Sequence, residues 1–368
     1  MKNPPKPATS RSSLATVLER VPASLREAHV ADALFLHLPA TVPPWTTTPL
    51  ELAKGSPFSW FAEGRVVLSE EAGLWNGPRL HLWGRVGGAG PLLNGTRDTA
   101  SFESPADGHL ELCIYSGEWA TRDGALATPE AGYALLSGGI DVLAVRWRGE
   151  ARAGVEALAA ALPDESAFAA ERDRLADPTP VPPGWHYLWF LGPAEIYRPA
   201  ATQPDGTPSI RVTTHDDVGI LQKPVDLPLG ADTRVGWRWR VDALPSAVAE
   251  DTLPTHDYLS LALEFENGQD LTYHWSAALP EGHHYRCPLP NWDARETHWV
   301  VRSGSEGLGA WHDEARPVRA DYAEAVGEPP GRIVGVWLIA VSVFQKGRGA
   351  AELADVWVES GGHRIQVL

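Results

Sequence analysis

The densest group of side chains that could do chemistry lies between residues 256 and 314. Six of the 13 histidines fall in this stretch, together with carboxylates, tyrosines and arginines. Histidines and carboxylates are common acid/base groups because their surroundings can tune their pKa values. On antiparallel strands such side chains can converge on one face of a sheet. The stretch contains His256-Asp257-Tyr258, Tyr273-His274, His283-His284-Tyr285-Arg286, His298, Arg302 and Trp311-His312-Asp313-Glu314.

This group predicts a catalytic or polar ligand-binding site. The alternative is a set of edge and loop residues with ordinary hydrogen bonds. Paired carboxylates are a further candidate, because Glu264 and Glu266 would lie on one strand face about 7 Å apart, within the range that glycoside hydrolases use. A solvated strand face explains that pair equally well. The candidate catalytic residues are His256, Asp257, Tyr273, His274, Arg302 and Glu314.

The metal-ligand patterns in the sequence are weak. His283 and His284 are adjacent, so on a strand they point to opposite faces and cannot bind one ion together. No HExxH motif occurs, and Cys113 and Cys287 lie in neither a CxxC nor a Cys/His spacing. We therefore predict no metal ligands, no cofactor and two buried free thiols. A disulfide between Cys113 and Cys287 is the alternative to free thiols. If a metal is bound, calcium held by loop carbonyls is the expected form.

Aromatic side chains are the second kind of candidate, because the chain has 16 tryptophans and one methionine. An exposed ladder of aromatic rings could stack sugars or another flat ligand. The alternative is that these rings fill the cores of packed sheets. The candidate ligand-binding residues are Trp75, Trp83, Trp185, Tyr187, Trp189 and Trp311.

The net charge of −16 at pH 7 argues against nucleic acid and anionic membranes as partners. A neutral or cationic small molecule is more compatible with it. No run reaches the roughly 18 apolar residues of a membrane span. The N-terminal residues lack the apolar segment of a secretion signal, so we expect a cytoplasmic protein. The oligomeric state stays open.

The elements that must position these candidates are mostly short strands. We predict a mainly β chain of two antiparallel β-sandwiches with helical inserts. Residues 1–40 are expected to form a helical N-terminal extension and residues 41–150 a first sandwich, because the hydrophobic period changes to two. Residues 151–183 are expected to form a helical segment and proline-rich linker, and residues 184–368 a second sandwich. WHYLWF, residues 185–190, is predicted as its first strand.

Part of the first half resembles a known lectin family. The segments are WTTTPLELAKGSPFSWFAEGRV and PRLHLWGRVG, followed by NGTRDTASFESPADGHLELCIYSGEW. They are similar to the galactophilic PA-IL-type bacterial lectins, and the resemblance covers residues 45–149. It implies a galactose-binding-like β-sandwich. The Asn/Asp run that holds calcium and sugar in those lectins is missing here, and Glu118 and Asp123 alone are too few for calcium.

The second half resembles an uncharacterised bacterial domain family. The resemblance covers residues 185–360 and implies a jelly-roll or carbohydrate-module-like sandwich. It implies no activity. The motifs that carry it are GWRWRVDALP, HDYLSLALEF, LTYHW, VVRSG and GAWHDEARPVRADYAEAVGEPPGRIVGVWL.

Together these patterns predict a lectin-like protein that binds a carbohydrate or small molecule in a cleft lined by aromatic, His, Asp, Tyr and Arg side chains. The alternative is an enzyme on a carbohydrate-module-like scaffold, such as a natural-product cyclase or isomerase, or a glycan lyase or hydrolase. A structural or partner-binding role is a third possibility. Convergence of the polar residues in one closed site favours the enzyme, and an open aromatic platform favours the lectin.

Overall fold

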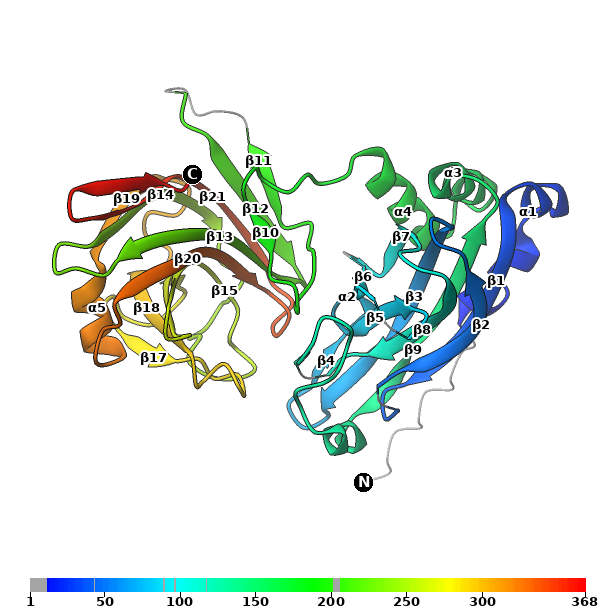
Figure 1. Cartoon of the computed structure of the whole chain (residues 1–368), viewed down its shortest axis with the longest axis horizontal. Helices are drawn as coiled ribbons and strands as arrows, with labels where there is room; N and C mark the ends of the chain where they lie inside the picture. The colour runs from blue at the N-terminus through cyan, green and yellow to red at the C-terminus, as the bar shows by residue number, and fades with distance from the viewer. Residues whose placement is uncertain (1–11, 43, 89, 96, 117, 201–205) are drawn as a thin grey trace. The chain divides into compact units, whose positions relative to one another are not determined.

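The chain forms two compact units, with the division between Pro178 and Thr179. Each unit is a sandwich of two sheets, so the predicted mainly β fold with two sandwiches is confirmed (Figure 1). Among the residues that are described, no helix is both long and apolar enough to cross a membrane. The computed structural model describes residues 12–42, 44–88, 90–95, 97–116, 118–200 and 206–368.

The first unit packs a five-stranded sheet against a four-stranded sheet. The apolar side chains between the two sheets include Phe58, Trp60 and Leu112. The five-stranded sheet has the order β1-β9-β3-β4, with β7 also paired to β3, and is made of β1 (Val30–Pro39), β9 (Ser137–Trp147), β3 (Pro57–Ser69), β4 (Leu74–Asn76) and β7 (Thr99–Glu103). The four-stranded sheet is made, in order, of β2 (Thr46–Leu52), β8 (Gly108–Ile114), β5 (Leu82–Val86) and β6 (Leu93–Asn94).

Two helices belong to the first unit rather than to a linker. They are α3 (Ala151–Ala161) and α4 (Ser166–Ala176), and their apolar residues join a second core that includes Phe61 and Trp147. The approach is close, because a Cβ atom at Gly154 would lie 2.2 Å from the Trp147 ring. The helical segment predicted for residues 151–183 therefore covers the outer face of the five-stranded sheet.

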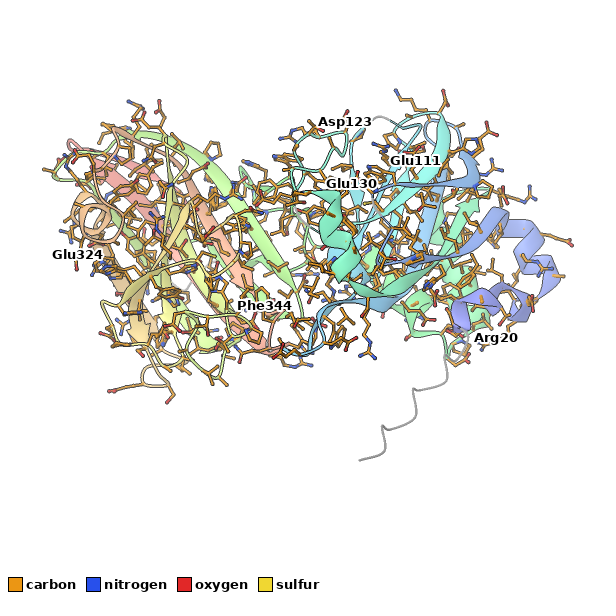
Figure 2. The ribbon with its side chains drawn as sticks, turned by 90° about the horizontal axis from the view of Figure 1, so that it is seen from below. Arg20, Glu111, Asp123, Glu130, Glu324 and Phe344 are labelled. Atoms are coloured by element: carbon orange, nitrogen blue, oxygen red, sulfur yellow. The ribbon has the colours of Figure 1, made fainter. Side chains whose placement is uncertain are left out.

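The expected helical extension over residues 1–40 is only partly helical. Two short 3-10 turns and α1 (Ala23–His29) are present, but the next ten residues form strand β1. Residues 30–39 form a strand because they pair with β9, which lies far away in the sequence, along most of their length. Residues 1–11 of the predicted extension lie outside the described residues. Arg20, labelled in Figure 2, forms an ion pair with Asp164, 2.5 Å away at the closest atoms.

The second unit packs a seven-stranded sheet against a six-stranded sheet around a large core that contains Trp237, Trp239, Tyr273 and Trp275. The seven-stranded sheet is made, in order, of β10 (His186–Tyr187), β13 (Val218–Pro228), β20 (Arg332–Val341), β15 (Tyr258–Phe265), β16 (Asp270–Ser276), β18 (Glu296–Ser303) and β17 (His284–Arg286). The six-stranded sheet is made of β11 (Tyr197–Ala200), β12 (Ser209–His215), β21 (Arg348–Ser360), β14 (Arg234–Ala243) and β19 (Trp311–Pro317), with β22 (His363–Gln366) beside β21. Helix α5 (Val318–Ala325) follows β19.

Two details of the second unit differ from expectation. WHYLWF contributes only the two-residue strand β10, because the backbone turns directly after it, with the Leu191 N–H donating to the Leu188 carbonyl. The sheet is also not wholly antiparallel, because β16 and β18 run parallel. That parallel pair brings residues from 270–274 beside residues from 296–300.

Candidate functional site

The two faces of the seven-stranded sheet carry different kinds of side chains. On β15, β16 and β18, one set of alternate residues faces the six-stranded sheet and is apolar, and the other set faces outward beneath loops and is mainly polar. The inward set includes Leu261, Leu263, Leu271, Tyr273, Trp275 and Trp299. The outward set includes Tyr258, Ser260, Asp270, Thr272, His274, Glu296 and His298. We call this second set, with its covering loops, the outer face.

The strand register places the outer-face residues side by side. Thr272 is paired with His298 in the parallel ladder, and Asp270 with Glu296. Ser260 is paired with His274 across the antiparallel ladder. All of these side chains are buried, and those of Thr272, His274 and His298 have no measurable exposure. A fully buried sheet face is normally apolar, so this concentration of polar groups calls for a functional explanation.

Four of the buried groups form a compact cluster: His256, Cys287, Glu296 and His298. One nitrogen, sulfur or oxygen atom from each lies within 4.8 Å of the others. The Cys287 Sγ is 3.5 Å from the His256 Nε2, and the His298 Nε2 is 3.4 Å from a Glu296 carboxylate oxygen. His256 lies two residues before the start of β15, and Cys287 is the first residue after β17.

Several buried polar atoms on the outer face have no hydrogen-bond partner. They are the Ser260 Oγ, the His274 Nδ1 and both ring nitrogens of His298. Although the His298 Nε2 is near Glu296, it does not make a hydrogen bond with it. Leaving a buried polar group unpaired costs about 1–3 kcal/mol. The fold carries this cost at several neighbouring positions.

Aromatic rings enclose His298. The ring of Tyr285 stacks on it with centroids 4.9 Å apart and an interplanar angle of 10°. The rings of His256 and Tyr258 meet it edge-on, at 4.8 and 4.7 Å. His283 in turn stacks on Tyr285 at 5.7 Å. His283 and Tyr285 are half-buried, so this stack leads from the fully buried cluster toward the surface.

Burial controls the protonation of the outer face. It lowers the pKa of His256 to about 3, with a smaller contribution from His298. It also holds the pKa of His274 well below the usual range. Both rings are therefore neutral at pH 7, and each has a nitrogen lone pair available to accept a hydrogen bond or bind a metal.

The two neighbouring carboxyls of the outer face have opposite shifts. Burial, and then the charge of Glu296, raises the pKa of Asp270. Burial alone would raise the pKa of Glu296 as well, but His298 outweighs it and holds the pKa at about 2. The Tyr258 hydroxyl and the Thr272 hydroxyl both donate to one Glu296 oxygen, at 3.0 and 3.2 Å. Glu296 is thus held as a carboxylate, whereas the folded state favours the protonated form of Asp270.

Of the residues proposed for catalysis from the sequence, only His256 and His274 lie on the outer face, and only His256 belongs to the four-residue cluster. The Asp257 carboxylate instead accepts hydrogen bonds from the backbone N–H groups of Phe344 and Gln345, at 3.1 and 2.7 Å. The Tyr273 hydroxyl points to the opposite side of the sheet and donates to Asp321, at 3.0 Å. The Tyr273 contact places its side chain on the inward face, and the Asp257 carboxylate is engaged by these two backbone groups.

Arg302 and Glu314 also lie apart from the outer face. They form an ion pair with each other, and the Trp239 indole donates to the same carboxylate at 3.1 Å. The Arg302 guanidinium lies 5.6 Å from the centroid of the inward-facing Trp275. This pair therefore belongs to the side of the seven-stranded sheet that faces the six-stranded sheet.

The aromatic candidates do not form an exposed platform. All 16 tryptophans and eight tyrosines are buried or half-buried. In the first unit, Trp83 packs against Tyr115 and Trp119, and the Arg65 guanidinium lies over the half-buried Trp75.

The aromatic candidates of the second unit are similarly engaged. Trp185 lies in the core beneath the Lys223 ammonium, and Trp189 packs edge-on against Phe190. The Tyr187 hydroxyl donates to the Ala194 carbonyl. Trp311 is half-buried, with the guanidinium groups of Arg238 and Arg240 within 5.7 Å of its ring.

Sequence reasoning placed His298 in the polar stretch but did not select Glu296 or Cys287 as site residues. A signal for Glu296 was present, because Glu296 and His298 stand two apart on a strand and so share a face. No local signal identified Cys287, which joins the cluster through the pairing of β17 with β18.

The second unit is thus a β-sandwich with a candidate ligand-binding face beneath its loops. Residues 183–357 match the family model described as "Protein of unknown function (DUF3047)". This agrees with the resemblance seen in the sequence to an uncharacterised family. A search of curated proteins finds no match.

Solved structures give further likenesses. The N-terminal part is similar to the EclA N-terminal domain, a PllA-like lectin, at 17% identity and TM-score 0.26, over 33% of this chain and 98% of that one. The CBM22 tandem of Paenibacillus barcinonensis Xyn10C is similar at 9% identity and TM-score 0.25. The likeness covers 90% of this chain and 99% of that one. TmCBM61, solved with β-1,4-galactotriose, is similar at 11% identity and TM-score 0.25. The likeness covers 48% of this chain and 88% of that one. These likenesses carry no ligand over to this chain.

Proposed function

We propose that this protein binds a carbohydrate on the outer face of the seven-stranded sheet in its second unit. The observation that supports this best is the group of buried atoms without hydrogen-bond partners on Ser260, His274 and His298. Sugar hydroxyls both donate and accept hydrogen bonds, so they can pair with hydroxyl and imidazole groups alike. A ligand of this kind would remove the cost of leaving those atoms unpaired.

The electrostatics of the outer face support a neutral ligand. His256 and His274 are neutral rings at pH 7, since burial lowers the pKa of each. The chain as a whole carries a net charge of −16, which disfavours anions. Carbohydrates are neutral and densely hydroxylated, and the ring of Tyr285 offers a flat surface for the apolar side of a pyranose.

The route to the outer face passes the short edge strand β17. It is joined to β18 through three residue pairs, His284–Trp299, Tyr285–His298 and Arg286–Thr297. Because β17 ends the sheet, it has no strand on its other side. Displacement of this strand would expose the face of His298 that Tyr285 covers. We infer that the sugar enters in this way.

Isothermal titration calorimetry of the full chain tests the proposal. The panel contains galactose, cellobiose, xylotriose and β-1,4-galactotriose, each titrated with and without calcium. At least one sugar should bind the wild-type protein, and His274→Leu should abolish that binding. His215→Leu is the matched control, because His215 is an exposed histidine on β12 of the same unit. No heat with any sugar would overturn the proposal.

The convergence of His256, His274 and Glu296 in a closed site favours a second candidate, an enzyme that acts on such a ligand. Acid/base catalysis needs these group types within reach of one substrate. Incubating the same sugar panel with the protein and analysing it by mass spectrometry tests this candidate. Conversion that is lost in Glu296→Gln supports an enzyme, whereas a panel that binds but stays unconverted supports a binding protein.

A further inference from the structure

We propose that His256, Cys287, Glu296 and His298 bind one divalent transition-metal ion, with zinc as the ion the donor set fits best. The proposal does not depend on carbohydrate binding. It starts from the geometry, since one donor atom of each side chain lies within 4.8 Å of the other three. Zinc binds nitrogen at about 2.0–2.1 Å and sulfur at about 2.3 Å, so the donor atoms of a tetrahedral site are about 3.3–3.7 Å apart.

Two of the donor separations already lie in this range. The Cys287 Sγ is 3.5 Å from the His256 Nε2, and the His298 Nε2 is 3.4 Å from the Glu296 Oε1. The remaining pairs are no more than 4.8 Å apart, so side-chain adjustments of about an ångström would bring them into the same range. The four residues are buried, which is typical of a closed structural site with four protein ligands.

The second line of evidence is the state of His298. Its side chain has no measurable exposure, and neither of its ring nitrogens has a hydrogen-bond partner. A buried imidazole with no partner is costly, since at least one of its nitrogens must be a donor and the other an acceptor. A metal ion bound by the Nε2 would account for one of these nitrogens directly.

The groups around the cluster orient the proposed ligands. The His256 Nδ1 lies 3.0 Å from the Glu250 carbonyl, so it carries the proton and leaves the Nε2 lone pair directed toward Cys287. The hydroxyls of Tyr258 and Thr272 hold the Glu296 carboxylate. Hydrogen bonds from neighbouring groups that hold and orient the ligands are usual around protein zinc sites.

The donor types select the ion. Two imidazoles, one thiolate and one carboxylate suit zinc or another borderline divalent ion. Calcium and magnesium require mainly oxygen donors and larger coordination numbers or retained water. The calcium expected from the sequence is therefore not the ion for which this cluster is suited. On binding, the Cys287 thiol releases its proton to solvent and the sulfur donates as a thiolate.

Cobalt substitution in the full chain tests the site. The protein is stripped with a chelator, dialysed and titrated with Co²⁺. One equivalent should give the intense visible absorption of tetrahedral cobalt and a near-ultraviolet sulfur-to-cobalt charge-transfer band, and Zn²⁺ should remove both. Cys287→Ser should lose the charge-transfer band. Cys113→Ser should keep it, because Cys113 is a buried free cysteine of the first unit and a matched control.

His298→Gln provides a second variant that keeps a similar side-chain volume. It should retain the charge-transfer band but lower cobalt affinity at least tenfold. Absence of both bands in the wild-type protein overturns the proposal whatever the variants do, and so does an unchanged spectrum in Cys287→Ser. Sugar binding is measured separately on the stripped protein. A failed cobalt titration and a failed sugar titration are therefore distinguishable.

Discussion

The two faces of one sheet in the second unit are built on opposite principles. On the inward face, Leu263, Tyr273 and Trp275 pack into the core of the sandwich. On the outer face of the same strands, Ser260, His274 and His298 are equally buried but leave polar atoms unpaired. Both faces exclude water, so burial alone does not explain the difference.

The inward residues stabilise the sandwich, and we propose that the outer-face residues bind a ligand. Burying a large apolar side chain contributes about 1.5–3 kcal/mol, whereas burying an unpaired polar group costs a similar amount. An apolar outer face would therefore make a more stable fold. We propose that a ligand completes the hydrogen bonds of the polar residues there, and variants on the two faces test this division.

Truncating the inward face should have the largest effect on stability. Trp275→Ala removes a side chain with no measurable exposure from the core, and we expect a loss of about 3–5 kcal/mol in the free energy of unfolding. Urea unfolding of the full chain, followed by labelling of the Cys287 thiol in a Cys113→Ser background, reports the second unit specifically. A loss below 1 kcal/mol would mean that the inward face is not the stabilising one.

Metal should stabilise the second unit by a somewhat smaller amount. At free zinc one hundred times its dissociation constant, binding to the folded state alone adds about 2.7 kcal/mol. Thermal melts of the chelator-treated wild-type protein should therefore shift upward when zinc is added. His298→Gln should show a reduced shift, and an equal shift in wild type and variant would contradict the assignment of His298 as a ligand.

Replacing an outer-face histidine should change stability little. His274→Leu removes a side chain whose Nδ1 is unpaired and whose Nε2 is 3.4 Å from the Tyr285 hydroxyl. Exchanging a poorly satisfied polar group for an apolar one of similar volume is close to neutral. The free energy of unfolding, measured without metal by the same thiol labelling, should stay within about 1 kcal/mol of wild type. A loss as large as that in Trp275→Ala would remove the contrast between the faces.

The smallest effect concerns the pH dependence of stability through Glu264, at the end of the outer face. Burial raises the pKa of this carboxyl, although the Trp337 indole, which donates to it at 3.1 Å, opposes the shift. The folded state therefore favours the protonated form. This contribution is fully present below the ordinary pKa of 4.5 and is lost as the pH rises through the folded value.

Glu264→Gln removes this titration, so the free energy of unfolding should fall less steeply between pH 4 and pH 7 than in wild type. Glu266→Gln is the control, because Glu266 is an exposed glutamate two residues further along the chain. If the free energy of unfolding changes equally steeply with pH in wild type and Glu264→Gln, the Glu264 carboxyl has the same pKa in the folded and unfolded states, which contradicts the prediction.

Much of the fold could be predicted from local patterns. Alternation in segments such as HDYLSLALEF and LTYHW indicates strands, and the turn at Asn267-Gly268 joins β15 to β16 as expected. Strand β1 was not predicted, because its pairing with β9 joins residues that are 100 or more positions apart. Local periodicity does not report such pairing.

The candidate site was only partly predictable for the same reason. The richness of the stretch in histidine was visible, but the parallel pairing of β16 with β18 decides which of its members meet. Asp257 and Tyr273 neighbour His256 and His274 in the sequence. Alternation along the strand nevertheless turns Tyr273 to the inward face, and the Asp257 carboxylate accepts hydrogen bonds from backbone groups far away in the sequence. Cys287 enters the cluster from a loop that carries no recognisable motif.

The most direct test of a ligand-binding outer face is nuclear magnetic resonance of the full chain with ¹⁵N only in its histidine rings. Variants at His274, His298 and His215 assign the resonances, and the sugar that binds in calorimetry is added to saturation. The ring nitrogens of His274 and His298 should shift, while those of the exposed His215 stay unchanged. Unchanged resonances of His274 and His298 at saturation would contradict the proposal that the outer face is the binding site.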